Sequence, residues 1–259
     1  MPSDLKAAPV HGRLAIRAER IGGKTVVTAV HRTEPFHLGA PVDRVGDGRA
    51  EIIIQSVGPG LLPGDETATE LAAGPGAFLI VRDQAALKLF SSRDGGAAVS
   101  HVQLRAEAGA TLIFLPGELI PYRDARFKQT TEIEVEPGGR IAFAEIITPG
   151  RTGMGETDRY ARLDLRVRAR IGGDLVLLDR AVLEPALRPL TAIGRHGAHP
   201  VSAALYLIGA DWPDIPPIEY ADGTLFAAGA GAGCRVVRAL GPTAQSIHRL
   251  LAYLLESIT

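Results

Sequence analysis

The sequence contains a single cysteine, Cys234, among its 259 residues. One thiol excludes an intramolecular disulfide and favours a reducing compartment, so we expect a cytoplasmic protein. The first residues lack the apolar stretch of a secretory signal peptide. No apolar run approaches the ~20 residues that a membrane-spanning helix needs. These absences predict a soluble protein that does not associate with membranes.

An excess of positive charge is missing too. Lys and Arg together number 28 and Asp and Glu 29, which gives a formal net charge of −1. A broad nucleic-acid interface needs a surplus of Lys and Arg on one face, so no nucleic-acid partner is expected. Aromatic residues make up only 5%, but hydrophobic residues reach 46%, which is enough for a sizeable core.

The common catalytic and nucleotide-binding motifs are also absent. There is no Cys-x-x-Cys, no His-Glu-x-x-His and no nucleophile elbow. The Gly-rich loop at 58–66 lacks the Lys-Ser/Thr pair of a phosphate-binding loop, and the one at 149–156 is not followed by a helical pattern. These absences favour a binding or scaffold protein over an enzyme.

Glycine and proline are plentiful, with 30 and 18 residues, and they mark turns. Three segments repeat the order strand, Gly turn, apolar strand, with turn glycines Gly76, Gly109 and Gly138. Each segment by itself has the pattern of a hairpin. The similar spacing of the turns also suits stacked β-coils. The sequence therefore predicts either a β-helix-like core or layered β-hairpins, and it leaves both possibilities open.

Further strands are expected at 25–30, 50–57, 163–171, 175–178, 202–208 and 234–240. Loops are expected at 209–223 and over the Gly/Ala run at 227–233. One apolar stripe, from Ile247 to Ile258, predicts an amphipathic C-terminal helix that begins near Pro242 or Thr243. We therefore expect a mainly β single domain over 1–259, with a flexible N-terminus at 1–11.

Five segments in order resemble the UreD (UreH) family of urease accessory proteins. They are Gly58–Asp65, Ala86–Ser92, Phe114–Tyr122, Gly150–Glu156 and Arg235–Gly241. The resemblance runs from about Gly12 to Leu255. Pro63, Leu87 and Ser91 depart from the family pattern.

The resemblance implies a non-enzymatic maturation factor with a β-helix-like core. Members of this family join a UreF-like scaffold protein and a UreG-like GTPase, and they help deliver nickel to apo-urease. A tunnel through the UreD-like subunit has been proposed as the nickel path. No tightly bound cofactor is implied, only transient nickel.

A conduit for nickel needs weak, exchangeable ligands, because a strong Cys/His site would trap an ion that stands high in the first-row affinity order. Carboxylates meet this need. The family-matched carboxylates Asp65, Glu118 and Glu156 are the first candidates, followed by Glu66 and Glu145. The alternative for each of them is an ordinary turn or surface charge.

The other candidates concern partner contacts and a second type of metal ligand. Partner contacts are expected at Arg151, Gly153, Gly155, Arg166 and Arg168. His196 and His199 are a weak metal-ligand pair, since two histidines three apart with no nearby Cys, Asp or Glu make at most half a site. A solvated loop is the alternative.

Two other functions stay open at this point. A β-helical carbohydrate-active enzyme would use a pair of carboxylates in a groove. Sugar clefts usually present aromatic rings, and Trp212 is the only tryptophan, which counts against such an enzyme. The second alternative is a β-scaffold that has no involvement with metal.

Overall fold

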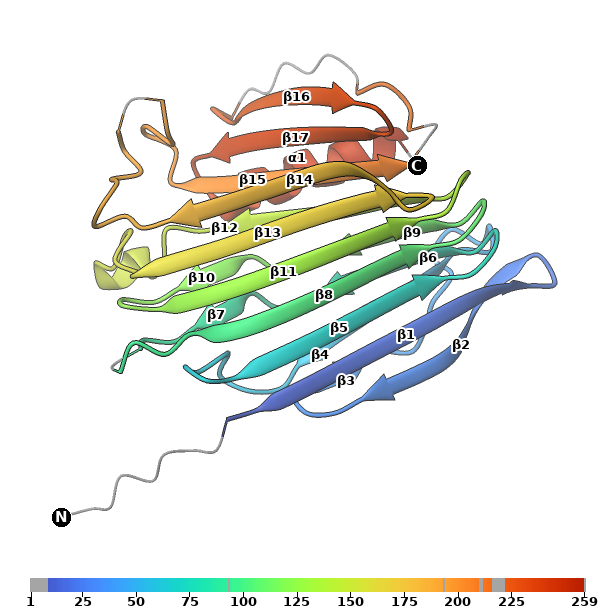
Figure 1. Cartoon of the computed structure of the whole chain (residues 1–259), viewed down its shortest axis with the longest axis horizontal. Helices are drawn as coiled ribbons and strands as arrows, with labels where there is room; N and C mark the ends of the chain where they lie inside the picture. Colours follow the sequence, from blue (N-terminus) through green and yellow to red (C-terminus); the bar gives the residue numbers. More distant parts are fainter. Residues whose placement is uncertain (1–8, 93, 193, 210–211, 216–221, 259) are drawn as a thin grey trace.

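The computed structural model describes residues 9–92, 94–192, 194–209, 212–215 and 222–258. Two twisted β-sheets lie face to face, and the helix α1 (Ala244–Ile258) packs on the outer face of one of them (Figure 1). The mainly β fold with a single C-terminal α-helix, predicted from the sequence, is confirmed in the described residues. No helix among them is both long and apolar enough to cross a lipid bilayer.

The first sheet, sheet A, has seven strands in the order β14-β13-β11-β8-β5-β1-β2. Their bounds are β1 His11–Ile21, β2 Lys24–Arg32, β5 Glu66–Ala73, β8 Ala98–Ala106, β11 Arg126–Val135, β13 Arg162–Ile171 and β14 Asp174–Leu183.

The second sheet, sheet B, has ten strands, eight of them in the order β16-β17-β15-β12-β9-β6-β4-β3. These eight are β3 Phe36–Leu38, β4 Ala50–Ser56, β6 Phe78–Asp83, β9 Thr111–Leu115, β12 Arg140–Ile147, β15 Val201–Gly209, β16 Leu225–Gly231 and β17 Cys234–Gly241. Two short strands, β7 (Leu87–Leu89) and β10 (Leu119–Pro121), join beside β12, and η1 (Thr152–Met154) is a 3-10 turn.

The three Gly turns carry the chain from sheet A to sheet B. The strands they join, β5 with β6, β8 with β9 and β11 with β12, lie in different sheets. Each pairs instead in parallel with its counterpart in the next coil, as in β5 with β8 and β6 with β9. The hairpin interpretation is therefore wrong for these segments, and the β-helix-like stack of coils is confirmed.

The turn glycines stack on one another. Gly76, Gly109 and Gly138 all have positive φ (66°, 69° and 81°), which other residues rarely adopt. A Cβ on Gly109 would lie 3.8 Å from the Cα of Gly76, and one on Gly138 would lie 3.7 Å from the backbone nitrogen of Gly109. Their regular spacing in the sequence therefore reflects one position repeated in successive coils.

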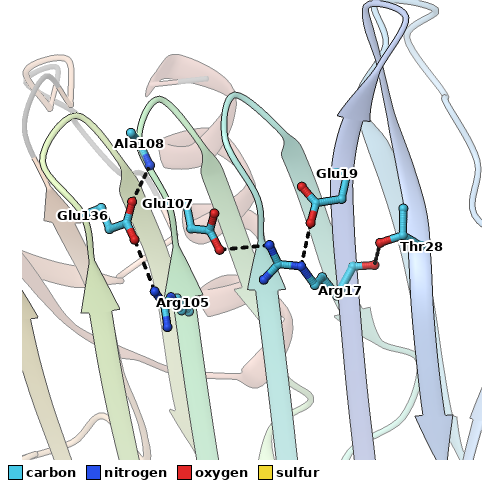
Figure 2. Close-up of polar contacts among 7 residues, drawn as sticks. All are labelled: Arg17, Glu19, Thr28, Arg105, Glu107, Ala108 and Glu136. Atoms are coloured by element: carbon cyan, nitrogen blue, oxygen red, sulfur yellow. Dashed lines mark hydrogen bonds and ion pairs between the residues drawn. The ribbon is translucent and has the colours of Figure 1, made fainter.

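Charged side chains connect the same turns on the outer face of sheet A (Figure 2). From β1, Arg17 places its Nη2 3.0 Å from Glu107 Oε1, just beyond the end of β8. From β8, Arg105 reaches Glu136 of the next coil with its Nη2 3.2 Å from Oε1. The second oxygen of Glu136 accepts a hydrogen bond from the Ala108 amide. Exposed pairs such as these add little stability individually, but they match the coil register.

The main core lies between the two sheets and consists of inward side chains from both. Three aromatic rings stack along the inner face of sheet B. Phe114 of β9, Phe143 of β12 and Tyr206 of β15 have centroids 5.9 Å apart at each step. Parallel pairing of β9 with β12 and antiparallel pairing of β12 with β15 place these rings opposite one another, and offset stacking adds to the free energy of burial.

The chain does form hairpins at its C-terminal end. β13 and β14 pair antiparallel, which confirms the alternating Arg strand and the turn predicted after it. The Gly/Ala run predicted as a loop at 227–233 is largely β16, antiparallel to β17, so that prediction is wrong there. Backbone pairing supports a strand even though alanine and glycine have low β-propensity. Of the loop predicted at 209–223, residues 210–211 and 216–221 lie outside the described residues.

The N-terminal strand β1 has no counterpart among the predicted strands, although Leu14, Ile16 and Ala18 alternate as buried residues. It pairs in parallel with β5, starting from His11 opposite Glu66. The flexible segment predicted at 1–11 falls mostly on residues 1–8, which are outside the described residues. Val10 and His11 are held by sheet A: the Val10 carbonyl accepts a hydrogen bond from the Glu66 amide.

Helix α1 begins after a reciprocal cap, in which the amide of Ser246 donates to Thr243 Oγ1 and the amide of Thr243 donates to Ser246 Oγ. Its predicted apolar stripe is buried and packs on β15 and β17. The stripe comprises Ile247, Leu250, Leu251, Leu254, Leu255 and Ile258. This confirms the helix and the face that it buries.

Replacing Leu254 with alanine tests this packing. Leu254 has no exposed surface, so Leu254→Ala should lower the free energy of unfolding by about 2–5 kcal/mol, measured by urea denaturation. Tyr253→Ala is the control on the exposed face and should change it by less than about 1 kcal/mol. Equal effects of the two substitutions would contradict the observed helix orientation.

Candidate functional site

A row of polar side chains runs through the interior between the sheets. Thr67 of β5, Ser100 of β8 and Gln129 of β11 are register partners on the inner face of sheet A, and all three are buried. Thr69 and Thr131 add hydroxyls two residues further along the same face. Parallel stacking places these side chains side by side, so polar groups from separate coils form one continuous lining.

Two cavities lie along this interior. The smaller, of about 190 Å³, is lined by Thr67, Thr69, Ser100 and Gln129 together with apolar residues. The larger, of about 490 Å³, is lined by Glu145, Arg238 and His196 with Leu165 and Leu183 among its apolar walls. The linings of the two are joined where Gln129 Nε2, from the smaller cavity, donates a 2.9 Å hydrogen bond to Glu145 Oε1, from the larger.

Glu145 is the ionisable group at this junction. It comes from β12, in sheet B, where its neighbours in sequence are buried apolar residues. Burial raises the pKa of the Glu145 carboxyl to about 7, and the nearby Asp179 acts in the same direction. Hydrogen bonds from Tyr206 and Gln129 oppose the shift. A carboxyl with such a pKa can hold or release a proton near neutral pH.

The contact between Tyr206 and Glu145 can also be made when the Glu145 carboxyl is protonated. Tyr206 Oη lies 2.6 Å from Asp179 Oδ2 and 3.2 Å from Glu145 Oε2. A phenol has one proton to donate, and the shorter contact assigns it to Asp179. Glu145 completes the second hydrogen bond when it carries a proton of its own. Arg238 bonds to Asp179 Oδ2 and neutralises that charge.

The other predicted conduit residues do not meet at this junction. Asp65 is buried, and both of its oxygens accept backbone hydrogen bonds: Oδ1 from Val10 and Oδ2 from Leu62, each 2.8 Å long. These two hydrogen bonds hold the Gly58–Asp65 loop against the start of β1. Glu66 is half-exposed at the start of β5, where it lies near His11 and His101.

Glu118 lies on the other side of sheet B, beside α1. Its Oε2 is 3.0 Å from His248 Nε2, and this hydrogen bond lowers the pKa of the Glu118 carboxyl. Arg82 and Asp83 share with them a cavity of about 240 Å³. The pair connects the loop after β9 to the helix. Glu118 is therefore separated from Glu145 by the sheet.

Glu156 holds the loop at 150–156 in shape. It accepts two hydrogen bonds from Arg151, of 2.8 and 2.7 Å, which lower the pKa of its carboxyl. The Arg151 guanidinium also stacks 4.0 Å from the centre of the Tyr122 ring. Gly153 has open space around its Cα, and Gly155 takes the left-handed conformation at the end of η1. Gly153 and Gly155 thus lie on an exposed but well-braced loop.

Arg166 and Arg168 project from the outer face of sheet A, on alternate positions of β13. Arg168 Nη1 lies 3.3 Å from Glu132 Oε1. Arg166 makes no ion pair within the part of the chain that the structure describes. Both remain predicted partner contacts.

His196 and His199 lie in different surroundings. His199 Nε2 is 2.9 Å from the Gly223 carbonyl oxygen. His196 lines the larger cavity, and its Nδ1 is buried without a hydrogen-bond partner among the described residues. Burial and Arg195 lower the pKa of His196. No three His, Cys, Asp or Glu side chains in the described ranges gather as a metal centre.

The residues around Glu145 were not predicted from the sequence. Gln129 carries a weak signal, since it and Thr131 are polar residues at inward positions between Phe127 and Ile133. Asp179 lies on β14 and Arg238 on β17, which belong to different sheets. Tyr206 is 61 residues from Glu145 in the chain. Only the fold brings these four side chains together.

The raised pKa of Glu145 predicts how stability depends on pH. Folding raises this pKa from 4.5 to about 7, so the contribution of Glu145 to stability is complete below pH 4.5 and is lost as pH rises through 7. Glu145→Gln keeps both hydrogen bonds but cannot ionise. The free energy of unfolding of this variant, relative to the wild type, should rise between about pH 5 and about pH 8 by up to roughly 3 kcal/mol.

Urea denaturation at several pH values measures this difference. The exposed Glu134→Gln on β11 is the matched control and should show no such trend. A difference between Glu145→Gln and wild type that stays constant with pH would contradict the raised pKa.

Comparisons with known proteins agree with the resemblance seen in the sequence. A family model described as UreD urease accessory protein matches residues 10–259. The urease accessory protein UreD of Opitutus terrae is 31% identical over 95% of this chain and 91% of its own length. UreD of Acetivibrio thermocellus is 29% identical over 70% and 69%, and UreH of Helicobacter hepaticus 30% identical over 67% and 68%. The chain belongs to the UreD family of urease accessory proteins, which are maturation factors rather than catalytic enzymes.

Proposed function

We propose that this chain helps deliver nickel to apo-urease through the interior between its two sheets, in a complex with a UreF-like scaffold protein and a UreG-like GTPase. Family membership supports the maturation role. The observation that carries the nickel path is the polar row that leads to the buried carboxyl of Glu145. With this function, the alternative of a carbohydrate-active enzyme is set aside.

The chemistry of the lining suits an ion that must bind weakly and be released again. Hydroxyl, amide and carboxyl oxygens are weaker ligands for nickel than thiolate and imidazole groups. The polar row offers Thr67, Ser100 and Gln129, followed by Glu145. A pKa near 7 allows Glu145 to lose its proton when a cation arrives and to regain it when the cation leaves. Glu145 is thus the conduit candidate with the strongest structural support.

The loop at 150–156 offers a surface for the accessory partners. Arg151 and Glu156 fix its shape, while the Met154 side chain between them is 69% exposed. A braced loop lowers the backbone ordering cost of binding, and its exposed methionine supplies apolar contact area. Arg166 and Arg168 add positive charge on sheet A.

A maturation assay tests the role of Glu145. Urease genes are expressed with a complete set of accessory proteins in which this chain is wild type, Glu145→Gln or Glu145→Asp. Glu145→Gln should lower the nickel content and activity of purified urease several-fold, because it removes the ionisable ligand. Glu145→Asp should keep much of both. Co-purification of the accessory proteins should be equal for all three chains.

The control and the contradicting result are specific. Glu134→Gln makes the same chemical change on the exposed face of β11 and should mature urease like the wild type. If the Glu145→Gln chain loads urease with as much nickel as the wild type does, Glu145 is not part of the nickel path. That result would favour a metal-independent scaffold. Loss of co-purification with Glu145→Gln would assign the residue to assembly instead.

A further inference from the structure

One ring nitrogen at the larger cavity is left unsatisfied by the fold. His196 Nδ1 is buried and has no hydrogen-bond partner among the residues that the structure describes. Buried polar atoms in folded proteins are nearly always paired, so an unpaired one points to a functional role or to a bound partner. The same imidazole ring lines the cavity of about 490 Å³ that Glu145 also lines.

The loop before β15 fixes the position of His196. The amide of His196 donates a 2.9 Å hydrogen bond to the Leu190 carbonyl, and the His196 carbonyl accepts a 3.0 Å hydrogen bond from the His199 amide. Leu190 is itself buried, in the same core cluster as Leu163 and Leu165 of β13. The backbone of His196 is therefore tied to the core of the protein, and the fold places its ring at the cavity.

We propose that His196 is the second nickel ligand on the path between the sheets, and that it exchanges the ion with Glu145 in the larger cavity. This inference rests on the proposed nickel path and adds one named group to it. His199, three residues further along, is not part of the path. Its Nε2 lies 2.9 Å from the Gly223 carbonyl oxygen.

The two ligands differ in chemistry and together suit nickel. Glu145 offers carboxyl oxygens, and His196 offers an imidazole nitrogen, a group that binds nickel well. No third His, Cys, Asp or Glu joins them as a metal centre in the described ranges. At most two protein groups then hold the ion at one time, and water completes its coordination. A site with so few protein ligands releases its ion readily, as a path requires.

The charges around His196 also favour release. Arg195 and Arg238 line the same cavity. Asp179 bonds to Arg238 and offsets its charge, whereas Arg195 Nη1 donates to the neutral carbonyl of Arg188. A positive charge near a cation site weakens binding of the cation. A single imidazole beside a guanidinium group therefore binds nickel without trapping it.

The burial of the two ligands gives their order along the path. Glu145 is buried, whereas His196 is partly exposed. The cavity reaches the surface, because Gly194, Leu225 and Ala227 line it and all three are exposed. Within this cavity, Glu145 is thus the inner ligand and His196 the ligand nearer to solvent.

The urease maturation assay with complete accessory proteins tests His196. His196→Phe keeps an aromatic ring but removes its nitrogens, so it should lower the nickel content of purified urease several-fold. It breaks no hydrogen bond at Nδ1, so the melting temperature of the chain should not fall. His199→Phe is the matched control in the same loop and should load urease with as much nickel as the wild type does.

Nickel binding to the chain itself gives a readout that is independent of urease. The full chain, with isotope-labelled histidine, is titrated with nickel sulfate and followed by NMR. Paramagnetic nickel broadens the signals of the imidazole that it binds. The His196 signals, assigned by their absence in His196→Phe, should broaden at a several-fold lower nickel concentration than the His199 signals.

The outcomes separate this inference from the nickel path on which it rests. If Glu145→Gln lowers nickel loading and His196→Phe does not, the path stands and the assignment of His196 is overturned. If neither substitution lowers loading, the path itself is wrong and the inference fails with it. A lower melting temperature of His196→Phe, or equal broadening of the His196 and His199 signals, would also overturn the role of His196 as a ligand.

Discussion

The parallel register between successive coils is the constraint on which the other features depend. Every coil places one strand in sheet A and one in sheet B, and each strand hydrogen-bonds to its equivalent in the next coil. Equivalent side chains then lie one strand apart, about 4.8 Å. This repetition stacks Gly76 on Gly109 and Gly138, and it places the rings of Phe114 and Phe143 next to one another. It also places Thr67, Ser100 and Gln129 in a polar row.

The packing of the two sheets around β12 explains why a carboxyl can be buried at Glu145. Polar groups from three other strands are held near it: Gln129 on β11, Asp179 on β14 and Tyr206 on β15. Gln129 and Tyr206 form hydrogen bonds with its oxygens, while burial and the charge of Asp179 raise its pKa to about 7. An isolated buried charge would be costly, whereas a hydrogen-bonded carboxyl that can take up a proton is tolerated. The interior thus stays folded while retaining a group that can ionise.

Local periodicity was sufficient for some elements and insufficient for others. The Arg-alternating strand at 162–171 and the helix stripe from Ile247 to Ile258 were predictable because each buries one face with a clear period. The Gly turns were also visible, but a hairpin and a crossing between sheets bury the same alternate residues. Only the hydrogen-bond partners differ, and these lie about 30 residues away.

The candidate site shows the same limit. Glu145 was named from the sequence as one carboxylate among several, and nothing local separates it from Asp65 or Glu156. The structure separates them by their partners: backbone amides for Asp65, a guanidinium for Glu156, and neutral groups inside the sheets for Glu145. Those partners come from distant coils, so the distinction requires the fold.

The central claim is that nickel travels between the two sheets, past Glu145. The most direct measurement is X-ray diffraction at the nickel absorption edge, from crystals of the chain soaked in nickel. The account predicts an anomalous peak in the interior, within coordination distance of the Glu145 carboxyl, that disappears in Glu145→Gln. Nickel found only on the outer surface, at sites such as His248 or His11, would contradict it.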